Sequence, residues 1–360
     1  MKKIRDREQY LRHQRRSLRR VLRRRRLKAA KHAALFASIP LEKTSRSYVQ
    51  PVRVPREYSP AVAPPVLSMI DNPIASTEFF SRLTDNYRRG KRSFVYLRDV
   101  ERIGYDAIVV LLSIMIRYKA KKIKFAGDFP NDVRANAILK NSGFFEALYE
   151  EEFVEQDRYV VHGTSAIRTH ADKEVDPELT ASLITSAGKT VWGSECRSQG
   201  IQRVLLELML NTNNHASLHG QGEKHWWLTV NHVPEQNKVL FSFVDFGVGI
   251  FRSLDHKPIG NKFARWRDKL AGWWDGTSNV EVMKQILSGD FHRRVAGQEF
   301  RGKGLPGIAQ AFQRGWLSNL VIITNDVYVD LGRDKTMTLK HPFEGTLVSW
   351  ELEMTNRHTA

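Results

Sequence analysis

The sequence predicts an α/β protein preceded by a strongly basic arm. Two observations carry this prediction. Strand-like and helix-like segments alternate between residues 75 and 165, and glycine-rich motifs mark the ends of predicted elements between 175 and 355. The chain has 360 residues, of which 41% are hydrophobic and 10% are aromatic. This is the composition of a folded protein, and the length is sufficient for two domains.

Cysteine content and hydropathy indicate the cellular compartment in which the protein is expected. The single cysteine, Cys196, excludes an internal disulfide and a cysteine-based metal cluster. It also fits a reducing compartment, so we expect a cytoplasmic protein. No apolar run reaches the roughly 18 to 20 residues that a membrane helix needs, and no signal-type apolar segment follows the basic residues. We therefore expect no membrane span.

Most of the positive charge lies in a basic arm, residues 1–34. The arm holds 15 Lys or Arg against two acidic residues, which gives +13 of the net charge of +18. Such an arm either contacts nucleic acid or another anionic surface, or serves as a solubilising tail. Seven of the thirteen prolines lie between residues 40 and 73. This density breaks helices and strands, and it predicts a linker over residues 35–74.

Residues 75–165 are predicted to form a small α/β domain. In chain order we expect a helix over 76–90 that begins at a capping residue, a strand over 93–100, a strongly apolar helix over 105–120 and a strand over 121–129. A last helix over 131–143 opens with an N-cap candidate and ends at Gly143. Alternating strands and helices favour a layered α/β structure.

This region resembles the STAS fold, the small domain of anti-sigma-factor antagonists and of some transporter tails. The likeness rests on the segment LRDVERIGYDA, the apolar helix that follows it and the segment NDVRANAILKNSGFFEAL. Phosphorylated members of that family carry a serine at the start of the apolar helix, where this chain has Gly104, Tyr105 and Asp106. The resemblance thus implies a docking or dimerising module and not a phosphorylation switch.

A helix predicted over residues 199–218 carries an unusual polar stripe. Its polar members, which fall within about 100° of the helix circumference, are Glu207, Asn211, Asn214 and His215. Leucines beside the stripe can bury the helix against a sheet. A carboxylate one turn before an amide suits hydrated Mg²⁺, because the amide oxygen can bind the ion while the carboxylate deprotonates a water. The alternative is a stripe whose polar groups are satisfied by neighbouring loops.

Two further motifs suit a nucleotide. The alternating segment NKVLFSFVDFGVGI reaches a carboxylate at Asp245 and then two glycines. A carboxylate at a strand end can accept a hydrogen bond from an exocyclic amine, and glycines let the backbone approach a flat ligand. The segment RGKGLPGIAQAF places glycines and a lysine before a helix, whose free N–H groups suit a phosphate chain. Each motif alone is equally explained by a turn or a hinge.

Together these motifs resemble the ATP-binding domain of the GHKL superfamily, which includes gyrase B subunits, the heat-shock chaperone ATPase, histidine kinases and mismatch-repair ATPases. Four boxes occur in the family's order over residues 175–355, namely ELMLNTNNHA, DFGVGI, GKGLPGI and FEGTLVSWEL. The resemblance implies a Bergerat-type ATP-binding fold, a two-layer α/β sandwich with a mixed sheet. No Walker motif argues for a P-loop fold.

The resemblance implies a role for each matching residue. Asn211 would bind Mg²⁺, Glu207 would be the general base for the attacking water, and Asp245 would accept a hydrogen bond from the adenine amine. The remaining nucleotide contacts would come from His215, Gly247, Gly249, Gly302, Lys303, Gly304, Leu305 and Thr346. Asn214 stands where many histidine kinases have a phosphate-contacting lysine, so that contact is not carried over.

The glutamate of the first box favours hydrolysis. We expect a Mg-ATP-binding and hydrolysing molecular switch of bacterial type, in stress regulation or defence, whose nucleotide state controls a protein or nucleic-acid partner or a homodimer. The alternatives are an anti-sigma-type serine protein kinase and a non-hydrolysing ATP-sensing adaptor. The lid, residues 251–301, holds Trp266, Trp273 and Trp274, which form either a core cluster or a partner surface.

The basic arm generates a first prediction. Deleting residues 1–34 will weaken binding to DNA or RNA and remove most of its salt dependence, because each phosphate that a basic side chain neutralises releases counterions. The measurement is the slope of log Kd against log salt concentration for the full chain and the truncated chain. An unchanged slope would leave the arm with a solubilising role only.

Overall fold

The first sheet in the computed structural model is formed by three short parallel strands. The described residues are 57–149, 158–162, 165–170, 175–196, 198–215, 226–251, 278–288 and 304–356. The strand order is β1 (Ser59–Val62), β3 (Ser93–Tyr96) and β5 (Phe125–Gly127), and β2 (Val66–Leu67) pairs in parallel with β4 (Arg102–Ile103). The predicted alternation of strands and helices is confirmed from residue 75 onward. The linker predicted over residues 35–74 is wrong at its C-terminal end, because β1 and β2 lie within it. Pro60 is tolerated in β1 because β1 is an edge strand of its sheet.

Four helices complete this N-terminal half, residues 57–149. They are α2 (Pro73–Arg88), α3 (Tyr105–Ala120), α4 (Val133–Asn141) and α5 (Phe144–Tyr149). An N-cap is predicted where the segment over 131–143 opens, and the N-cap of α4 is Asp132, its second residue. The Asp132 carboxylate accepts a hydrogen bond from the Ala135 N–H at 2.8 Å. α2 begins before the expected capping residue, because Pro73 suits the first helical turn. Ser76 instead donates to the Ser68 carbonyl at 2.8 Å.

The larger sheet has six described strands, each antiparallel to its neighbours. Their order is β10 (Ser318–Asp330), β11 (Lys335–Leu352), β9 (Lys238–Asp245), β8 (Trp226–Val233), β7 (Ser165–His170) and β6 (Arg158–His162). The expectation of a mixed sheet is wrong for these strands. The turn between β8 and β9, η1 (Pro234–Gln236) followed by Asn237 at φ 49°, is of the short kind that joins antiparallel strands.

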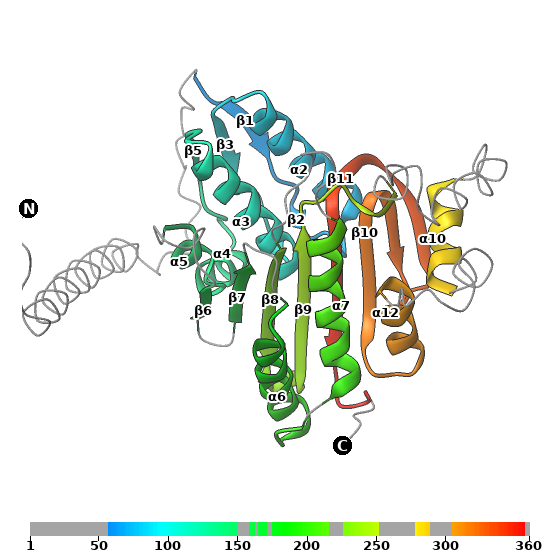
Figure 1. Ribbon diagram of the computed structural model, residues 1–360. Coiled ribbons are helices and arrows are strands. Elements are labelled where there is room, and N and C mark those ends of the chain that lie inside the picture. The colour runs from blue at the N-terminus through cyan, green and yellow to red at the C-terminus, as the bar shows by residue number, and fades with distance from the viewer. Residues whose placement is uncertain are drawn as a thin grey trace, which may run out of the picture. The chain divides into compact units, whose positions relative to one another are not determined.

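Among the described residues, four helices pack on one face of this sheet, which we call the α7 face. They are α6 (Pro177–Trp192), α7 (Gln199–His215), α10 (Asn279–Ser288) and α12 (Gly304–Gln313). The strand residues buried beneath them include Trp226, Leu228, Phe241, Phe243, Val348 and Trp350. α6 begins at the N-cap Asp176 and ends at Gly193, whose φ of 73° suits a glycine. Figure 1 shows α6 and α7 lying along the sheet.

The opposite face, which we call the α3 face, packs against the N-terminal half. Side chains alternate along a strand, so Trp227, Val244, Val321, Ile323 and Leu347 point away from the α7 face. They share one apolar cluster with residues of α2 and α3, and α3 contacts β8 and β9 directly. The segments predicted as two domains thus lie in one compact unit, Val54–Ala360, with a shared core.

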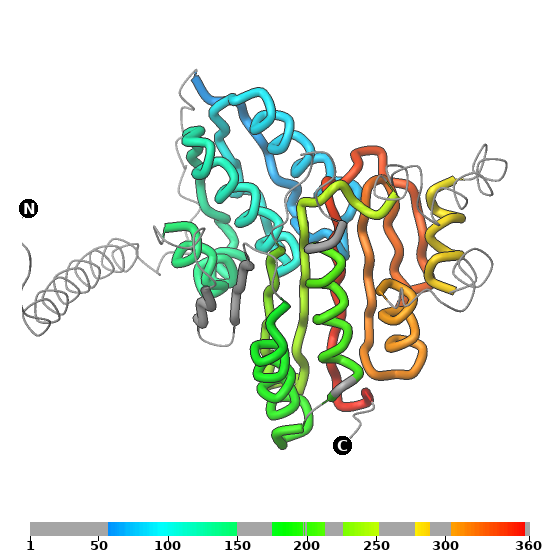
Figure 2. The backbone as a smooth tube through the Cα atoms, viewed as in Figure 1, coloured from blue at the N-terminus to red at the C-terminus, as the bar shows by residue number. Residues whose placement is uncertain are grey.

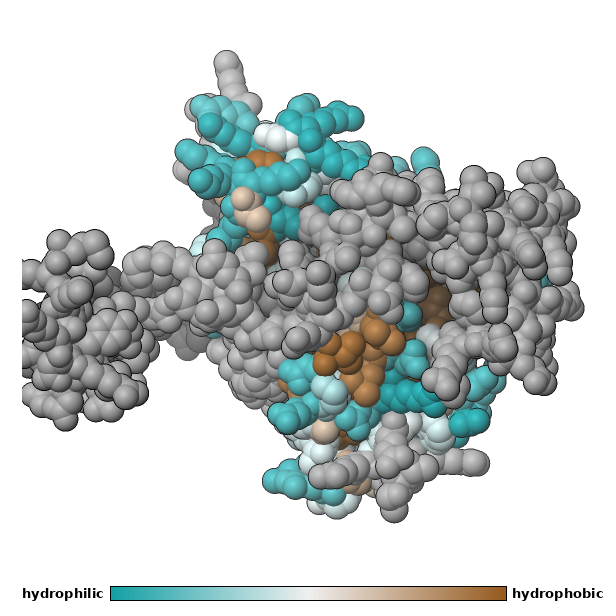
Figure 3. Space-filling model, in the orientation of Figure 1, coloured by the Kyte–Doolittle hydropathy of each residue, from teal (hydrophilic) through white to brown (hydrophobic). Residues whose placement is uncertain are grey.

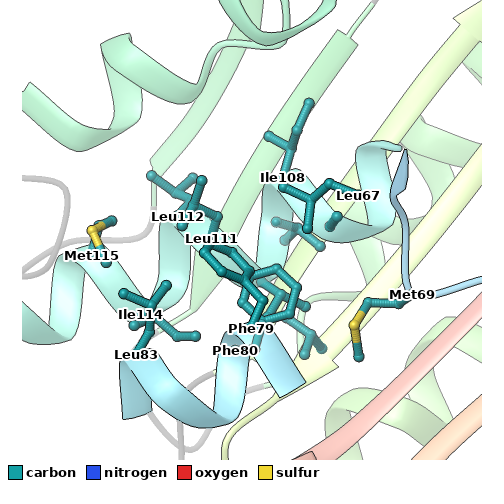
Figure 4. Packing of buried hydrophobic residues seen from close by; sticks show 14 of the residues in the cluster. Leu67, Met69, Phe79, Phe80, Leu83, Ile108, Leu111, Leu112, Ile114 and Met115 are labelled. Carbon is teal, nitrogen blue, oxygen red and sulfur yellow. The ribbon is translucent and has the colours of Figure 1, made fainter. Parts of the chain in front are cut away.

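The shared core explains the composition of α3. Every residue from Asp106 to Ile116 is buried, because α3 packs against α2 and α5 as well as the larger sheet. Figure 4 shows Ile108, Leu111, Leu112 and neighbouring side chains of this cluster. Although α3 is strongly apolar, no helix among the described residues is long and apolar enough to cross a membrane.

The fold generates a prediction about stability. Ile108→Ala in α3 removes a fully buried side chain and will lower the free energy of unfolding by about 2–5 kcal/mol. The matched control is Ile74→Ala in α2, where the side chain is 57% exposed and the change will stay within about 0.5 kcal/mol. The measurement is urea unfolding followed by circular dichroism and tryptophan fluorescence.

Because the core is shared, both probes will report one transition that shifts together in Ile108→Ala. Two separate transitions, with only one of them shifted by the substitution, would contradict a common core.

Candidate functional site

A partly buried carboxylate, that of Asp245, lies at the end of β9. Asp245 accepts hydrogen bonds from the Gly247 N–H at 2.8 Å and from the N–H and hydroxyl of Thr346. Asp245 and Thr346 are paired in the register of β9 and β11, so the strand pairing itself brings them together. Burial raises the pKa of Asp245 to about 7, and these hydrogen bonds offset part of the rise. The arrangement leaves a strong hydrogen-bond acceptor in a desolvated position.

The close approach of β11 to the end of β9 depends on Gly345, which lies within β11. Its φ is 97°, and a Cβ there would lie 1.8 Å from the Asp245 carbonyl oxygen. No other residue type fits that approach, because a side chain would both clash and strain the backbone. The glycine of the predicted Gly-Thr strand therefore sets how closely Thr346 and Asp245 meet.

The loop after Asp245 is held by two residues that the sequence analysis did not single out. The Asn325 amide accepts from the Phe251 N–H at 3.2 Å and donates to the Val248 carbonyl at 3.1 Å. The Thr324 hydroxyl accepts from the Ile250 N–H at 3.1 Å. A polar Thr-Asn pair inside the apolar run of β10 is the signal that could have indicated them.

Gly249 needs to be a glycine for the same reason. Its φ is 79°, and a Cβ at this position would come within 2.4 Å of the Asn325 amide oxygen. Asn325 is itself at a positive φ of 49°, where the register of β10 and β11 shifts. The local bulge thus places the Asn325 side chain against the loop that contains Gly247 and Gly249.

α7 places the predicted base and metal ligand one turn apart. Leu205, Leu208 and Met209 are buried against the sheet, and Glu207 and Asn211 are partly buried beside them. The Glu207 carboxylate lies 3.7 Å from the Arg203 guanidinium on the preceding turn.

The rest of the predicted stripe is less fully described. The backbones of Asn214 and His215 belong to α7, but their side chains lie outside the described part of the structure. On the outer side of the helix Leu210 is 44% exposed, and Figure 3 shows apolar side chains at the surface in the region of α7. The helix therefore presents apolar as well as polar groups near the candidate site.

The start of α12 lies against Asn211. A Cβ on Gly304 would come 2.7 Å from the Asn211 amide nitrogen, so the missing side chain makes room for this contact. At the other end, Gly200 of α7 lies against Trp316, which follows α12. The two helices are therefore antiparallel, and the N-terminus of α12 meets the C-terminal end of α7. Figure 2 shows the green tube of α7 beside the orange tube of α12.

Other residues predicted to contact the nucleotide either pack in the core or lie outside the described residues. Leu305 packs against the apolar cluster of the α7 face and so has a role in fixing the start of α12. Gly302 and Lys303 lie outside the described residues, as does most of the predicted lid, including its three tryptophans. Of the lid, only Phe251 and the stretch containing α10 are described.

The donor set is compatible with a magnesium ion that is shared with a ligand. Among the described residues no group of three or more His, Cys, Asp or Glu could hold a metal by itself. Mg²⁺ usually keeps several waters and takes one or two protein oxygens plus phosphate oxygens. The Asn211 amide, which lies against Gly304 at the start of α12, fits that limited contribution.

Asp245 generates a prediction about pH. Its pKa in the folded chain, about 7, lies above the ordinary value of 3.8, so the folded chain holds this proton more tightly than the unfolded chain does. The free energy of unfolding will therefore fall as the pH rises from about 4 to about 7, by up to about 1.4 kcal/mol per pH unit from this group.

In Asp245→Asn this share of the pH dependence will be absent, and the measurement is urea unfolding of both chains at matched pH. Burial also raises the pKa of Asp106, to about 6, and this contributes with the same sign to both chains. Equal slopes for the two chains would contradict a raised pKa at Asp245.

Comparison with known proteins adds no assignment to this geometry. No model of a known protein family matches the chain, and no curated protein matches it in sequence. What the site can do is therefore inferred from its own residues.

Proposed function

We propose that the chain binds Mg-ATP and hydrolyses it, as a cytoplasmic molecular switch of bacterial type. This proposal includes the Bergerat-type fold of the GHKL superfamily for residues 175–355 and a STAS-like fold for residues 75–165. The observation that carries it is the approach of Asn211 to Gly304, because it joins the first and third predicted boxes across two antiparallel helices.

The adenine would bind at the end of β9. The Asp245 carboxylate offers a desolvated, partly buried acceptor for the exocyclic amine, and Thr346 is hydrogen bonded to that carboxylate. Gly247 and Gly249 would leave room for the flat base, as the positive φ of Gly249 and the absence of side chains allow. A buried acceptor discriminates strongly, because a ligand without the matching donor leaves it unpaired.

The phosphates would bind near the N-terminus of α12. Free N–H groups in the first turn of a helix attract anions, and the adjoining Gly302 and Lys303 would add backbone donors and a positive charge. Asn211 would contribute an oxygen to Mg²⁺, which would neutralise phosphate charge. His215, on the last turn of α7, would reach the same end of the nucleotide.

Glu207 would accept the proton of the attacking water at its carboxylate. It lies one turn before Asn211 and is partly buried, so it would reach a water beside a terminal phosphate held near Asn211. One observation favours the non-hydrolysing adaptor as a second candidate. The Arg203 guanidinium 3.7 Å away competes for the same carboxylate, although the arginine is more than half exposed.

A labelling experiment separates the candidates. Incubating the chain with γ-labelled ATP, Mg²⁺ and cell extract will release free phosphate if the chain is a hydrolysing switch. A serine kinase of the anti-sigma type would instead yield labelled protein, and an ATP-sensing adaptor would yield neither.

The role of Glu207 generates a specific prediction. Glu207→Ala will reduce hydrolysis at least about a hundredfold and leave the Kd for ATP within about threefold of the unsubstituted chain, since general bases contribute about 10²–10⁴-fold to the rate. Glu281→Ala is the matched control, because Glu281 is an exposed helix residue that pairs with Lys284 in the same helix. Undiminished hydrolysis in Glu207→Ala would remove the residue from the role of base.

A further inference from the structure

One arginine of the N-terminal half contacts both chain segments that form the adenine end of the candidate site. Arg117, in the last turn of α3, lies with its guanidinium 5.0 Å from the ring centre of Phe246. The same group lies 3.6 Å from the Glu344 carboxylate and 4.6 Å from the ring centre of Tyr87 in α2. The Arg117 side chain is only 15% exposed, so it is held largely out of water.

Phe246 is the immediate neighbour of Asp245, on the other side of the sheet. Residues 241 and 243 of β9 belong to the α7 face, so the alternation of the strand directs Asp245 to that face also. Phe246 belongs to the apolar cluster of the α3 face, where its ring lies 5.8 Å from that of Phe343. A displacement of the Phe246 side chain would therefore shift the backbone of its neighbour Asp245.

Glu344 lies two residues before Thr346 in β11. Only Gly345 separates them, and Gly345 is pressed against the Asp245 backbone. Arg88 of α2 pairs with the Glu344 carboxylate as well. The N-terminal half thus contacts each of the two strands that supply the hydrogen-bonded pair Asp245 and Thr346.

We propose that Arg117 is a positioning residue that couples the N-terminal half to the nucleotide site. Its charge is attracted both to the face of the Phe246 ring and to the Glu344 carboxylate, and both attractions are strengthened in a largely desolvated position. Holding these neighbours fixes Asp245 and Thr346 in their hydrogen-bonded arrangement before a ligand arrives. The inference rests on the proposed function, because it concerns the affinity of that site for ATP.

The coupling gives the N-terminal half a role. Coupling free energies are reciprocal, so if the placement of α3 changes the affinity for ATP, then ATP changes the placement of α3 by the same factor. A partner that binds the N-terminal half and displaces Arg117 would therefore weaken nucleotide binding. A partner could therefore respond to the nucleotide state by binding α2 and α3, in addition to the lid.

The test is titration calorimetry of the full chain with Mg-ATP. Arg117→Met removes the charge but keeps a long apolar side chain, and it will raise the Kd at least about fivefold. Arg117→Lys keeps the charge without the planar group and will have an intermediate Kd. Glu344→Gln will raise the Kd in the same direction. The control is Arg82→Met, since Arg82 is half exposed and pairs with Glu78 in its own helix.

The double variant Arg117→Met, Glu344→Gln distinguishes coupling from a merely structural role. If both residues act through one contact, the double variant will bind ATP about as tightly as Arg117→Met alone. A merely structural role would lower the free energy of unfolding and leave the Kd of the folded chain unchanged.

Each outcome is decisive. Unchanged affinity in Arg117→Met, Arg117→Lys and Glu344→Gln, with ATP still bound by the unsubstituted chain, would overturn the coupling and leave the proposed function standing. If Arg117→Met does not fold, unchanged affinity in the other two variants has the same meaning. Failure of the unsubstituted chain to bind ATP would overturn the proposed function and this inference with it.

Discussion

Alternation along β9 and β11 is the constraint on which the rest of the structure depends. Successive side chains of these strands point to opposite faces, and both faces of the sheet are buried, one by α7 and its neighbours and the other by α2 and α3. The side chains of Asp245 and Phe246 therefore lie on opposite sides of one sheet. A displacement of either layer acts on the same short stretch of backbone.

The candidate site combines this rigid sheet with a few special backbone positions. Burial opposes the charge of Asp245, and hydrogen bonds from Gly247 and Thr346 recover part of the cost. Gly345 permits the close contact of the two strands, while the Asn325 bulge holds the following loop. Groups fixed in this way lose little freedom when a ligand binds, which favours affinity.

Local patterns were sufficient for many elements and for part of the site. A capped start to α4, the alternating strand that ends at Asp245 and the helix that carries Glu207 were all predictable, because they depend on neighbours in sequence. Burial of α3 on all sides, the antiparallel larger sheet and the contacts of Asn325 and Arg117 were not. These depend on how distant segments meet, which periodicity within one segment does not encode.

We propose that the ends of β9 and α7 and the start of α12 form one nucleotide site. A crystal structure of the full chain with a non-hydrolysable ATP analogue and Mg²⁺ tests it most directly. We expect the adenine amine to lie within hydrogen-bond distance of Asp245, and the phosphates to lie between Asn211 and the N-terminus of α12. A nucleotide bound elsewhere, or a crystal grown in excess analogue that contains none, would contradict it.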